Sequence, residues 1–359
     1  MDLEERIEFV HYEGRVDLPH LHIGYNSVVH GYVRLGRNVR IGNSSYIVSE
    51  NSKVIIGDNV EIGDLNIIKE RDHDPENKGL DIIIKDNTIT KSNVSIENGI
   101  VVGERNYLGT GTNLGRKIVI GNDNRFNRGS HIARNTTIGN DNIFYNCTIG
   151  SAPEGQERKR DEIQDTEVII GDRNTFREYL AINRGSHSRG ANGITKLGDN
   201  NLVLGKVQIG HDCNIGRKVV IVSEGGLAGH VVVCDNAWIS GQAGVTQFVH
   251  VGNYSFIGAA SKVEGNVLPY SRVYGNPAVY RGINTERLER MFPDDEERKK
   301  VFHELKQAFK IIEDKSIPDK NLAEKLRELN SSYANEIADF IENINLKEKA
   351  RILRFKRGR

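Results

Sequence analysis

The sequence lacks the features that mark nucleic-acid-binding, membrane and secreted proteins. Its 49 Lys and Arg residues balance 49 Asp and Glu residues, whereas a nucleic-acid coat needs a basic excess to neutralise phosphates. No apolar run approaches the roughly 18–20 residues of a membrane span. The acidic start, Met1 to Glu5, lacks a basic segment followed by an apolar one, so we expect no signal peptide. We therefore expect no nucleic-acid partner and no membrane span.

Cysteine is scarce as well. The three cysteines, Cys147, Cys213 and Cys234, are scattered and form no CxxC pair. This usage predicts reduced thiols and a cytoplasmic location rather than a disulfide scaffold. Glycine, by contrast, is common at 37 residues but lacks the every-third-residue period of collagen. A different periodicity must account for the high glycine content.

A six-residue hydrophobic period runs through most of the chain. Every sixth residue from Leu197 to Val263 is aliphatic, which chance would not sustain in a chain that is 37% hydrophobic. A second stretch keeps the same spacing from Val102 to Phe144. A third stretch begins with Ile23, Val29, Leu35, Ile41 and Ile47 and resumes at Ile56 and Ile62.

This period predicts a mainly β fold, a left-handed parallel β-helix built from hexapeptide repeats. Three short strands of about six residues make one triangular coil, each aliphatic residue points inward, and coils stack at about 4.8 Å. The small residue that often follows the aliphatic one, such as Gly210 or Gly216, is expected at a tight corner where a Cβ would crowd the turn. A β-sandwich is the alternative, but its strands alternate with period two.

Three interruptions of the period predict loops that project from the β-helix. They lie between Asp64 and Asp81, between Gly150 and Val168, and around 186–193. A solenoid expels insertions as loops, and loops on a rigid scaffold are natural places for substrate contacts.

After Ile283 the apolar residues recur at three- and four-residue spacing, which predicts a C-terminal α-helical cap. Pro293 and the aspartates after it open one helix, and Pro318 separates this helix from the next. One apolar stripe consists of Val301, Leu305, Phe309 and Ile312.

Reactive side chains on the outside of the expected prism are the candidates for chemistry, because its interior is aliphatic. His211 and His230 stand 19 residues apart, close to one coil of about 18, and should be neighbours on stacked coils. His250 follows 20 residues later. Such histidines can ligate zinc, act as a general base towards a sugar hydroxyl, or lie on the surface without a role. Asp212 bears on the electrostatics of His211, although adjacent strand residues usually face opposite ways.

Five segments occur in order and resemble a known enzyme family. They are INRGS, TKLGDNNLVLGKVQIGHDCNIG, GGLAGHVVV, VTQFVHVG and GINTERLER. Together they resemble the UDP-N-acetylglucosamine acyltransferase family, which performs the first step of lipid A synthesis. The resemblance covers Leu80 to the C-terminus. We therefore expect N-terminal extra β-helix coils at 1–80, a β-helical acyltransferase domain at 81–282 and a helical domain at 283–359.

The resemblance implies transfer of an acyl group from an acyl carrier protein thioester to the 3-hydroxyl of a UDP-linked N-acetylglucosamine. By this resemblance His211 is the general base and the amide of Gly229 donates to the oxyanion. Other positions carried over are His230 and Gln247 for the sugar, Asn284, Glu286 and Arg290 for the nucleotide, and Ala259 for acyl-chain length. The family is a homotrimer with each site between two prisms, and the small Ala259 implies room for a fairly long chain.

Several positions depart from the family pattern. Gly155 and Glu157 occupy a first loop where the family has an Asp and a Lys that hold the sugar and the acyl chain. Gln208, Thr246 and Pro277 replace family histidines, and Gln208 stays among the candidate substrate-binding residues. A changed substrate shell implies a different sugar, for example one with a 3-amine, or a different acyl donor.

Two other functions remain open at this point. One is a metal-dependent hydratase of the β-helical carbonic anhydrase type, which zinc in the purified protein would favour. The other is a non-catalytic scaffold that binds a nucleotide sugar, which binding without turnover would favour. The pairing of His211 with Gly229 ranks acyl transfer above both, and we expect no metal and no cofactor beyond the acyl donor.

Overall fold

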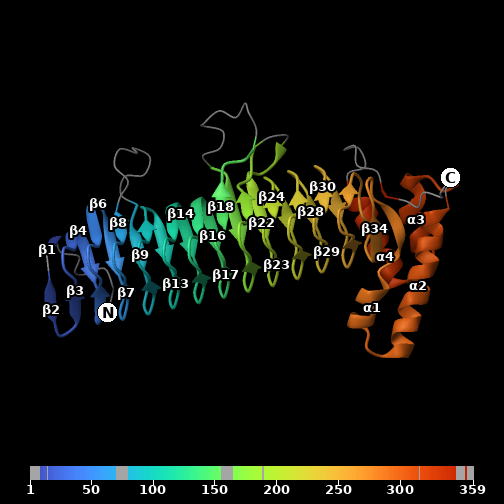
Figure 1. The fold of residues 1–359 in the computed structure, drawn as a ribbon. Coiled ribbons are helices and arrows are strands. Elements are labelled where there is room, and N and C mark those ends of the chain that lie inside the picture. The colour runs from blue at the N-terminus through green and yellow to red at the C-terminus, as the bar shows by residue number, and fades with distance from the viewer. Residues whose placement is uncertain are drawn as a thin grey trace. The chain divides into compact units, whose positions relative to one another are not determined.

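The computed structural model describes residues 9–13, 15–69, 80–154, 165–187, 190–314, 316–344 and 352–353. The chain divides into two compact units, 1–200 and 201–359. Both units are built mainly from short β-strands, and the second also carries the helices (Figure 1).

The first unit holds strands β1 (Phe9–Glu13), β2 (Val16–Leu18), β3 (Leu21–Ile23), β4 (Val28–Leu35), β5 (Val39–Ile41), β6 (Tyr46–Ile56), β7 (Glu61–Ile62), β8 (Ile67–Lys69), β9 (Ile82–Ile84), β10 (Ile89–Thr90), β11 (Ser95–Ile96), β12 (Ile100–Val102), β13 (Tyr107–Leu108), β14 (Asn113–Ile120), β15 (Arg125–Phe126), β16 (His131–Ile138), β17 (Ile143–Phe144), β18 (Thr148–Ser151), β19 (Glu167–Ile170), β20 (Thr175–Phe176), β21 (Ala181–Asn183) and β22 (Ile194–Leu197).

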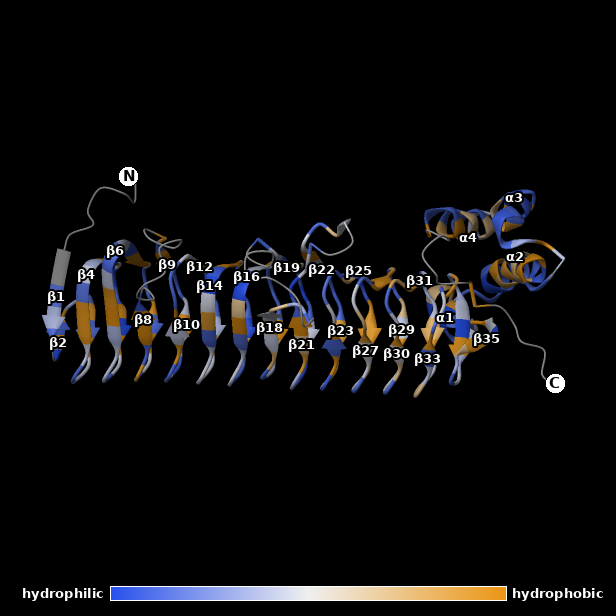
Figure 2. Cartoon of the chain, turned by 90° about the horizontal axis from the view of Figure 1, so that it is seen from above, coloured by the Kyte–Doolittle hydropathy of each residue, from blue (hydrophilic) through white to orange (hydrophobic). Residues whose placement is uncertain are grey.

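These strands wind into the left-handed parallel β-helix that the six-residue period predicts. Leu108 pairs with Thr90 on one side and with Phe126 on the other, one coil away in each direction. The predicted inward positions from Val102 to Phe144 are all buried. Apolar and polar residues are mixed along the short strands (Figure 2). This mixture is expected, because only some positions of each strand face the interior.

The N-terminal end adds antiparallel strands to the coils. β1 runs antiparallel to β4, with Tyr12 opposite Val29, and β2 runs antiparallel to β3. Parallel pairing begins with β3 to β5 and β4 to β6. Leu35, expected inside, is only half-buried, whereas Ile56 beside it on the next coil is buried. Leu35 is less covered because it lies at the end of the stack.

The coils resume in register after the predicted loops. Ile56 pairs with Ile84, and Ile138 pairs with Ile170, so the register is kept across both interruptions. The first predicted loop, 64–81, is shorter than expected, because Ile67–Lys69 forms strand β8. Gly155 and Glu157, the departures in the first family loop, lie outside the described residues.

Two buried ladders connect successive coils of the first unit. Phe126, Phe144 and Phe176 stack with ring centroids 4.5 and 5.1 Å apart. The second ladder consists of Asn106, Asn124, Asn142 and Asn174. Each asparagine Oδ1 accepts the backbone N–H of the next asparagine, at 2.8–3.0 Å. The side chains therefore satisfy buried donors and fix the register between coils.

The second unit holds strands β23 (Leu202–Val203), β24 (Gln208–Ile209), β25 (Asn214–Ile215), β26 (Val220–Ile221), β27 (Gly226–Leu227), β28 (Val232–Val233), β29 (Trp238–Ile239), β30 (Gly244–Val245), β31 (His250–Val251), β32 (Phe256–Ile257), β33 (Lys262–Val263), β34 (Ser271–Tyr274) and β35 (Val279–Ile283), followed by helices α1 (Thr285–Met291), α2 (Asp295–Glu313), η4 (Asp319–Asn321), α3 (Leu322–Arg327) and α4 (Ser332–Asn343).

The strands of the second unit form three faces of a parallel β-helix. One face runs β23, β26, β29, β32, a second β24, β27, β30, β33, and a third β25, β28, β31. All inward positions predicted from Val203 to Val263 are buried. The period therefore identified this core correctly.

The corners of these coils contain a left-handed residue that the period did not predict. Such residues recur every six positions from Lys206 to Ala260, three positions after an inward aliphatic residue. Gly210 was expected at a position where a Cβ would crowd the turn. A Cβ there would lie 2.8 Å from the backbone N of Gly229. The predicted crowding at Gly210 is thus confirmed. The left-handed corner residues, in contrast, carry side chains, although that conformation usually favours glycine.

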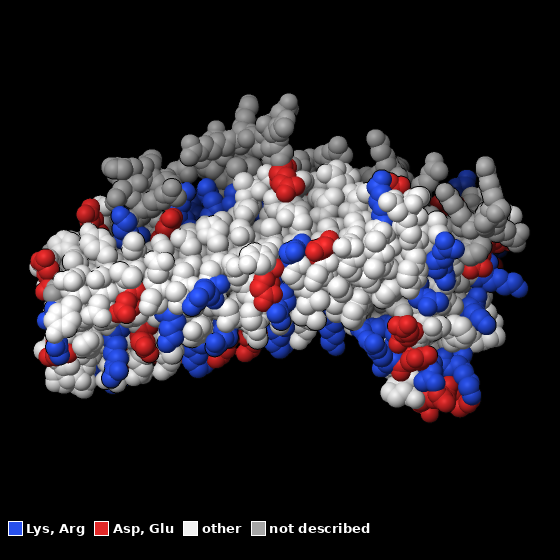
Figure 3. Space-filling view, viewed as in Figure 1, with Lys and Arg blue, Asp and Glu red and all other residues white. Residues whose placement is uncertain are grey.

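The helical cap packs its predicted apolar stripe inward. Val301, Leu305, Phe309 and Ile312 of α2 are all buried. Asp294 caps α2 by accepting the N–H of Glu297, and Ser331 caps α4 in the same way. On α4, Glu336 accepts hydrogen bonds from Asn253 Nδ2 at 2.7 Å and Tyr270 Oη at 2.5 Å. These bonds attach the cap to the last coils, and basic and acidic side chains are intermixed over its surface (Figure 3).

The cysteines were predicted to be reduced, and the chain to lack a membrane span. Cys147, Cys213 and Cys234 are free thiols. Within the described ranges, no helix is long and apolar enough to cross a membrane.

Candidate active site

Three stacked turns on one corner of the second unit bring the candidate residues together. The turns contain His211 and Asp212, then Gly229 and His230, then Gln247 and Phe248, each one coil after the last. The N–H of His230 donates to the carbonyl of His211 at 2.9 Å, and that of Phe248 to the carbonyl of Gly229 at 3.4 Å. The predicted proximity of His211 and His230 follows directly from this stacking.

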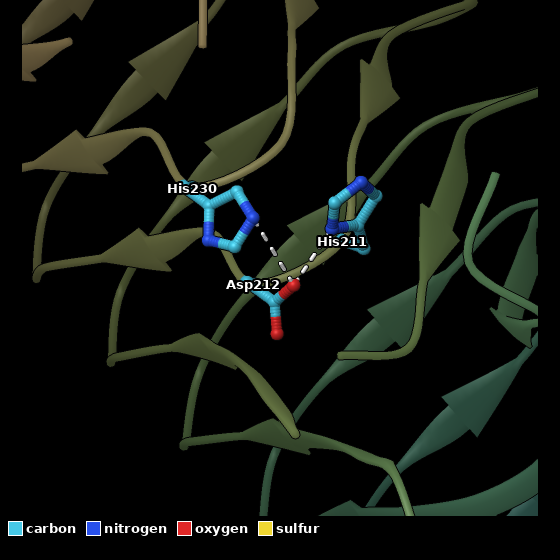
Figure 4. Close-up of side chains that lie close together, drawn as sticks. All are labelled: His211, Asp212 and His230. Carbon is cyan, nitrogen blue, oxygen red and sulfur yellow. Dashed lines mark hydrogen bonds and ion pairs between the residues drawn. The ribbon is translucent and has the colours of Figure 1, made fainter. Parts of the chain in front are cut away.

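His211 and Asp212 form a buried pair. Their side chains meet with 2.7 Å between Nδ1 and Oδ2 and are 9% and 4% exposed (Figure 4). Adjacent residues of a strand would point apart, but these two lie in a turn, and the φ of Asp212 is 61°. The left-handed backbone of Asp212 thus allows a contact that strand geometry would forbid.

His230 also faces the carboxylate of Asp212. Its Nε2 lies 3.7 Å from Asp212 Oδ2, and its ring meets that of His211 edge-on at 5.1 Å (Figure 4). On its other side His230 stacks on Phe248, with centroids 4.6 Å and planes 13° apart. The ring of His230 therefore lies between the rings of His211 and Phe248.

Gly229 provides the space that the His211 ring occupies. A Cβ at Gly229 would lie 2.6 Å from Cε1 and 2.8 Å from Nε2 of His211. Only a glycine lets the imidazole lie against this turn. Within the described residues, the N–H of Gly229 donates no hydrogen bond, so this donor remains for a ligand beside His211.

This arrangement suits general-base catalysis. A carboxylate only accepts hydrogen bonds, so Asp212 places the proton of a neutral His211 on Nδ1 and leaves the lone pair on Nε2. That Nε2 lies on the side of Gly229, whose N–H is a potential oxyanion donor. A proton acceptor and an anion-stabilising donor therefore adjoin one another.

The side chains of His211, Asp212 and His230 could also bind a metal ion together. His211, Asp212 and His230 each offer one ligand atom, and these atoms lie within 4.8 Å of one another. His250, the third histidine considered for zinc, lies on β31 and does not belong to this group. Geometry alone therefore permits both a general base and a metal site. The metal site would use two of the three candidate histidines, His211 and His230, together with Asp212.

Comparison with known proteins decides between them. A family profile described as UDP N-acetylglucosamine O-acyltransferase, Domain 2, matches residues 266–352. An acyl-acyl-carrier-protein–UDP-N-acetylglucosamine O-acyltransferase from Gloeothece citriformis is 34% identical over 200 residues, which cover 55% of this chain and 69% of that protein. Its counterpart from Aliarcobacter butzleri is 34% identical over 205 residues and is covered to 74%. This chain belongs to the UDP-N-acetylglucosamine O-acyltransferase family.

Solved structures of the family agree with this assignment. The UDP-N-acetylglucosamine acyltransferase from Campylobacter jejuni matches with a TM-score of 0.66 and 26% identity, covering 74% of this chain and 100% of that one. The enzyme from Bacteroides fragilis matches with a TM-score of 0.64 and 27% identity, covering 72% and 98%. Family membership makes the chain an O-acyltransferase, which favours acyl transfer over the hydratase and scaffold alternatives.

A separate pocket lies where α1 meets the β-helix. It has a volume of about 250 Å³ and is lined by Asn236, Trp238, Phe256, Asn284, Glu286, Arg287 and Arg290. The three positions predicted from the resemblance to contact the nucleotide, Asn284, Glu286 and Arg290, all line this pocket. Asn284 precedes α1, is 5% exposed, and donates from Nδ2 to the carbonyl of Tyr254 at 2.9 Å.

The remaining predicted site residues occupy outer positions of the same β-helix. Gln208 is half-buried on β24, beside Gly226 of the next coil. Gln247 is exposed in the turn that follows Gly229 by one coil. Ala259 is exposed in the turn after β32. None of these three positions is inside the prism, so each is accessible to a substrate lying along the outer surface.

Sequence reasoning missed three residues at these sites. Phe248 stacks on His230, and its place, one coil after His230, could have revealed it. Arg287 follows Asn284 by three residues on a helix and precedes Arg290 by three, a spacing that puts them on neighbouring positions. Trp238 is the single tryptophan and precedes an inward residue, so it had to face outward.

Proposed function

We propose that this chain moves an acyl group, a 3-hydroxyacyl group in the first instance, from acyl carrier protein to the 3-position of a UDP-N-acetylglucosamine-type sugar. The observation that carries the proposal is the His211–Asp212 pair lying against Gly229, in a chain of this acyltransferase family. The donor arrives as a thioester, and the reaction needs no other cofactor.

His211 acts as the general base. Its Nε2 takes the proton of the sugar 3-hydroxyl while that oxygen attacks the thioester carbonyl carbon. Asp212 stabilises the resulting imidazolium through the 2.7 Å contact with Nδ1. Without the carboxylate, the ring would lose both its fixed tautomer and this charge stabilisation.

Gly229 stabilises the intermediate. Attack places negative charge on the former carbonyl oxygen, and the Gly229 N–H donates to it. Collapse of the tetrahedral intermediate breaks the carbon–sulfur bond and releases the carrier thiolate, which takes the proton from the imidazolium of His211. The products are the O-acylated sugar nucleotide and the carrier thiol, so atoms and protons balance.

Binding residues complete the assignment. His230, Gln208 and Gln247 contact the sugar. Asn284, Glu286 and Arg290 contact the nucleotide, and Ala259 borders the far end of the acyl chain. The active form is a homotrimer in the cytoplasm, with coils 81–282 as the catalytic domain and 1–80 as additional coils. A cyclic threefold assembly would bury one face of each coil stack.

The test is a turnover assay on the full-length protein. Purified protein is incubated with acyl carrier protein thioesters and either UDP-N-acetylglucosamine or its 3-amino analogue, and the products are identified by mass spectrometry. We expect acylation of the hydroxyl acceptor that is lost in His211→Ala and kept in His303→Ala, an exposed histidine on α2. Product from His211→Ala at the wild-type rate would refute the base assignment. Acylation of the 3-amine alone would refute the acceptor.

A further inference from the structure

Arg287 enters the pocket beneath α1 from the side of the helix. Its Nη2 donates to Asn236 Oδ1 at 2.9 Å, which ties it to a turn of the β-helix. Its guanidinium carbon lies 5.9 Å from the ring centroid of Tyr254. These contacts fix the guanidinium at the pocket wall instead of letting it extend into solvent.

The hydrogen-bonding capacity of Arg287 is not used up by these contacts. Its Nε is buried and forms no hydrogen bond. Burial, and to a smaller degree the nearby Arg290, lowers the pKa of Arg287 below its ordinary value. In the described part of the chain neither Arg287 nor Arg290 forms an ion pair, although Glu286 lines the same pocket. Two guanidinium groups therefore line one pocket, and neither forms an ion pair with a described carboxylate.

The pocket lining also includes two aromatic side chains. Trp238 and Phe256 are register partners on β29 and β32, so their side chains project from neighbouring coils on the same face. Together the lining offers flat apolar surface, a carboxylate that accepts hydroxyl hydrogens and two guanidinium groups that fit phosphate. A ligand with a phosphate, hydroxyl groups and a flat or apolar part matches all three.

We propose that Arg287 binds a phosphate group of a substrate in this pocket and so sets specificity for a phosphorylated ligand. The inference rests on the proposed function, which supplies two substrates with such a group. One is the diphosphate of the nucleotide-linked sugar, and the other is the phosphodiester of the carrier's phosphopantetheine arm. Planar guanidinium binds phosphate through N–H donors, and among the described residues Arg287 uses only Nη2, towards Asn236.

Calorimetric titration of the full-length protein tests the assignment. The probes are UDP, uridine and 4′-phosphopantetheine, and the variants are Arg287→Gln and Arg287→Lys. Arg281→Gln is the matched control, because Arg281 is an exposed arginine on β35 outside the pocket. A melting curve for each variant verifies that it is folded. Glutamine removes the charge while keeping a polar, hydrogen-bonding side chain at the wall.

We expect Arg287→Gln to weaken UDP binding by about 10- to 100-fold, the usual effect of losing a charge-assisted hydrogen bond. Uridine binding should stay within about twofold, because the nucleoside has no phosphate. Arg287→Lys should recover part of the loss, because lysine keeps the charge but not the paired donors. In turnover, KM for the nucleotide sugar should rise with kcat nearly unchanged.

The outcomes separate the inference from the function on which it rests. Weaker phosphopantetheine binding with unchanged UDP binding would keep the phosphate assignment and move it to the acyl donor. Unchanged binding of both phosphorylated probes by Arg287→Gln would overturn the inference while leaving the proposed function intact. A wild-type protein that binds neither probe and forms no product would overturn both.

Discussion

His211 and Asp212 are neighbours in the sequence, and their side chains meet at 2.7 Å in the structure. Replacing Asp212 by Asn preserves the shape and tolerates the left-handed backbone, but it removes the charge that stabilises the imidazolium. We expect kcat for acyl transfer to fall by at least about tenfold, with little change in KM for the sugar nucleotide. Steady-state kinetics of the purified variant measure both.

A control for Asp212→Asn is available on an equivalent corner. Glu224 also has a left-handed backbone, with φ of 63°, but its carboxylate is exposed and contacts Lys206 and Gln242. Glu224→Gln should therefore leave kcat within about twofold, since exposed ion pairs contribute little. Equal losses in the two variants would show that Asp212 has no special part in the reaction.

Gly229→Ala should greatly lower activity without unfolding the protein. The added Cβ would lie 2.6 Å from His211 Cε1, so the imidazole must leave its position against the turn. Gly226→Ala is the matched control, because a Cβ at Gly226 meets no atom within 4 Å. We expect a fall in kcat of about 100-fold or more for the first variant and wild-type activity for the second. Wild-type activity in Gly229→Ala would rule out the proposed placement of the base.

The sequence was sufficient for the fold because one rule, an inward aliphatic residue every six positions, governs each coil. It placed His211 near His230 for the same reason, since residues about 18 apart stack. It did not reveal that Asp212 turns towards His211, because the left-handed backbone at that position belongs to a residue with a side chain. Nor did it reveal the antiparallel β1 or Leu35 as the uncovered end of the stack, since periodicity carries no information about where a stack ends.

The cysteines should be unreactive in the native protein. Burial raises the pKa of Cys147 and Cys213 to about 12 and that of Cys234 to about 11. A thiol in an unfolded chain ionises near pH 8.5, so at about pH 8 we expect a thiol reagent such as DTNB to label the native protein far more slowly than the denatured protein. Comparable labelling rates in both states would contradict this burial.

The same shifts give a direction for stability at high pH. Because the folded thiols keep their protons to higher pH than the unfolded ones, the folded state binds more protons between about pH 9 and 12. Stability contributed by these groups is complete below the unfolded pKa and is lost as pH rises through that window. Thermal unfolding of Cys213→Ser beside wild type at increasing pH would show a weaker decline in the variant.

Asn142→Ala should destabilise the first unit. Asn142 Oδ1 accepts the N–H of Asn174 at 2.8 Å, and its side chain is fully buried. Losing it leaves a buried donor unsatisfied, which costs about 1–3 kcal/mol. Asn214→Ala, at an exposed asparagine on β25, should change the melting temperature little at the same protein concentration. Equal melting temperatures for wild type and Asn142→Ala would refute the ladder's role.

Ala259→Met should shorten the preferred acyl chain. The residue is exposed in the turn after β32, so a larger side chain projects outward and leaves the prism core intact. If the acyl chain ends there, each methylene that no longer fits loses about 0.8 kcal/mol of binding, and kcat/KM for the longest thioesters falls most. The measurement is kcat/KM across carrier thioesters of increasing length, with Lys262→Met, exposed on β33, as the control. A chain-length profile that is the same in Ala259→Met as in wild type would place the end of the acyl chain elsewhere.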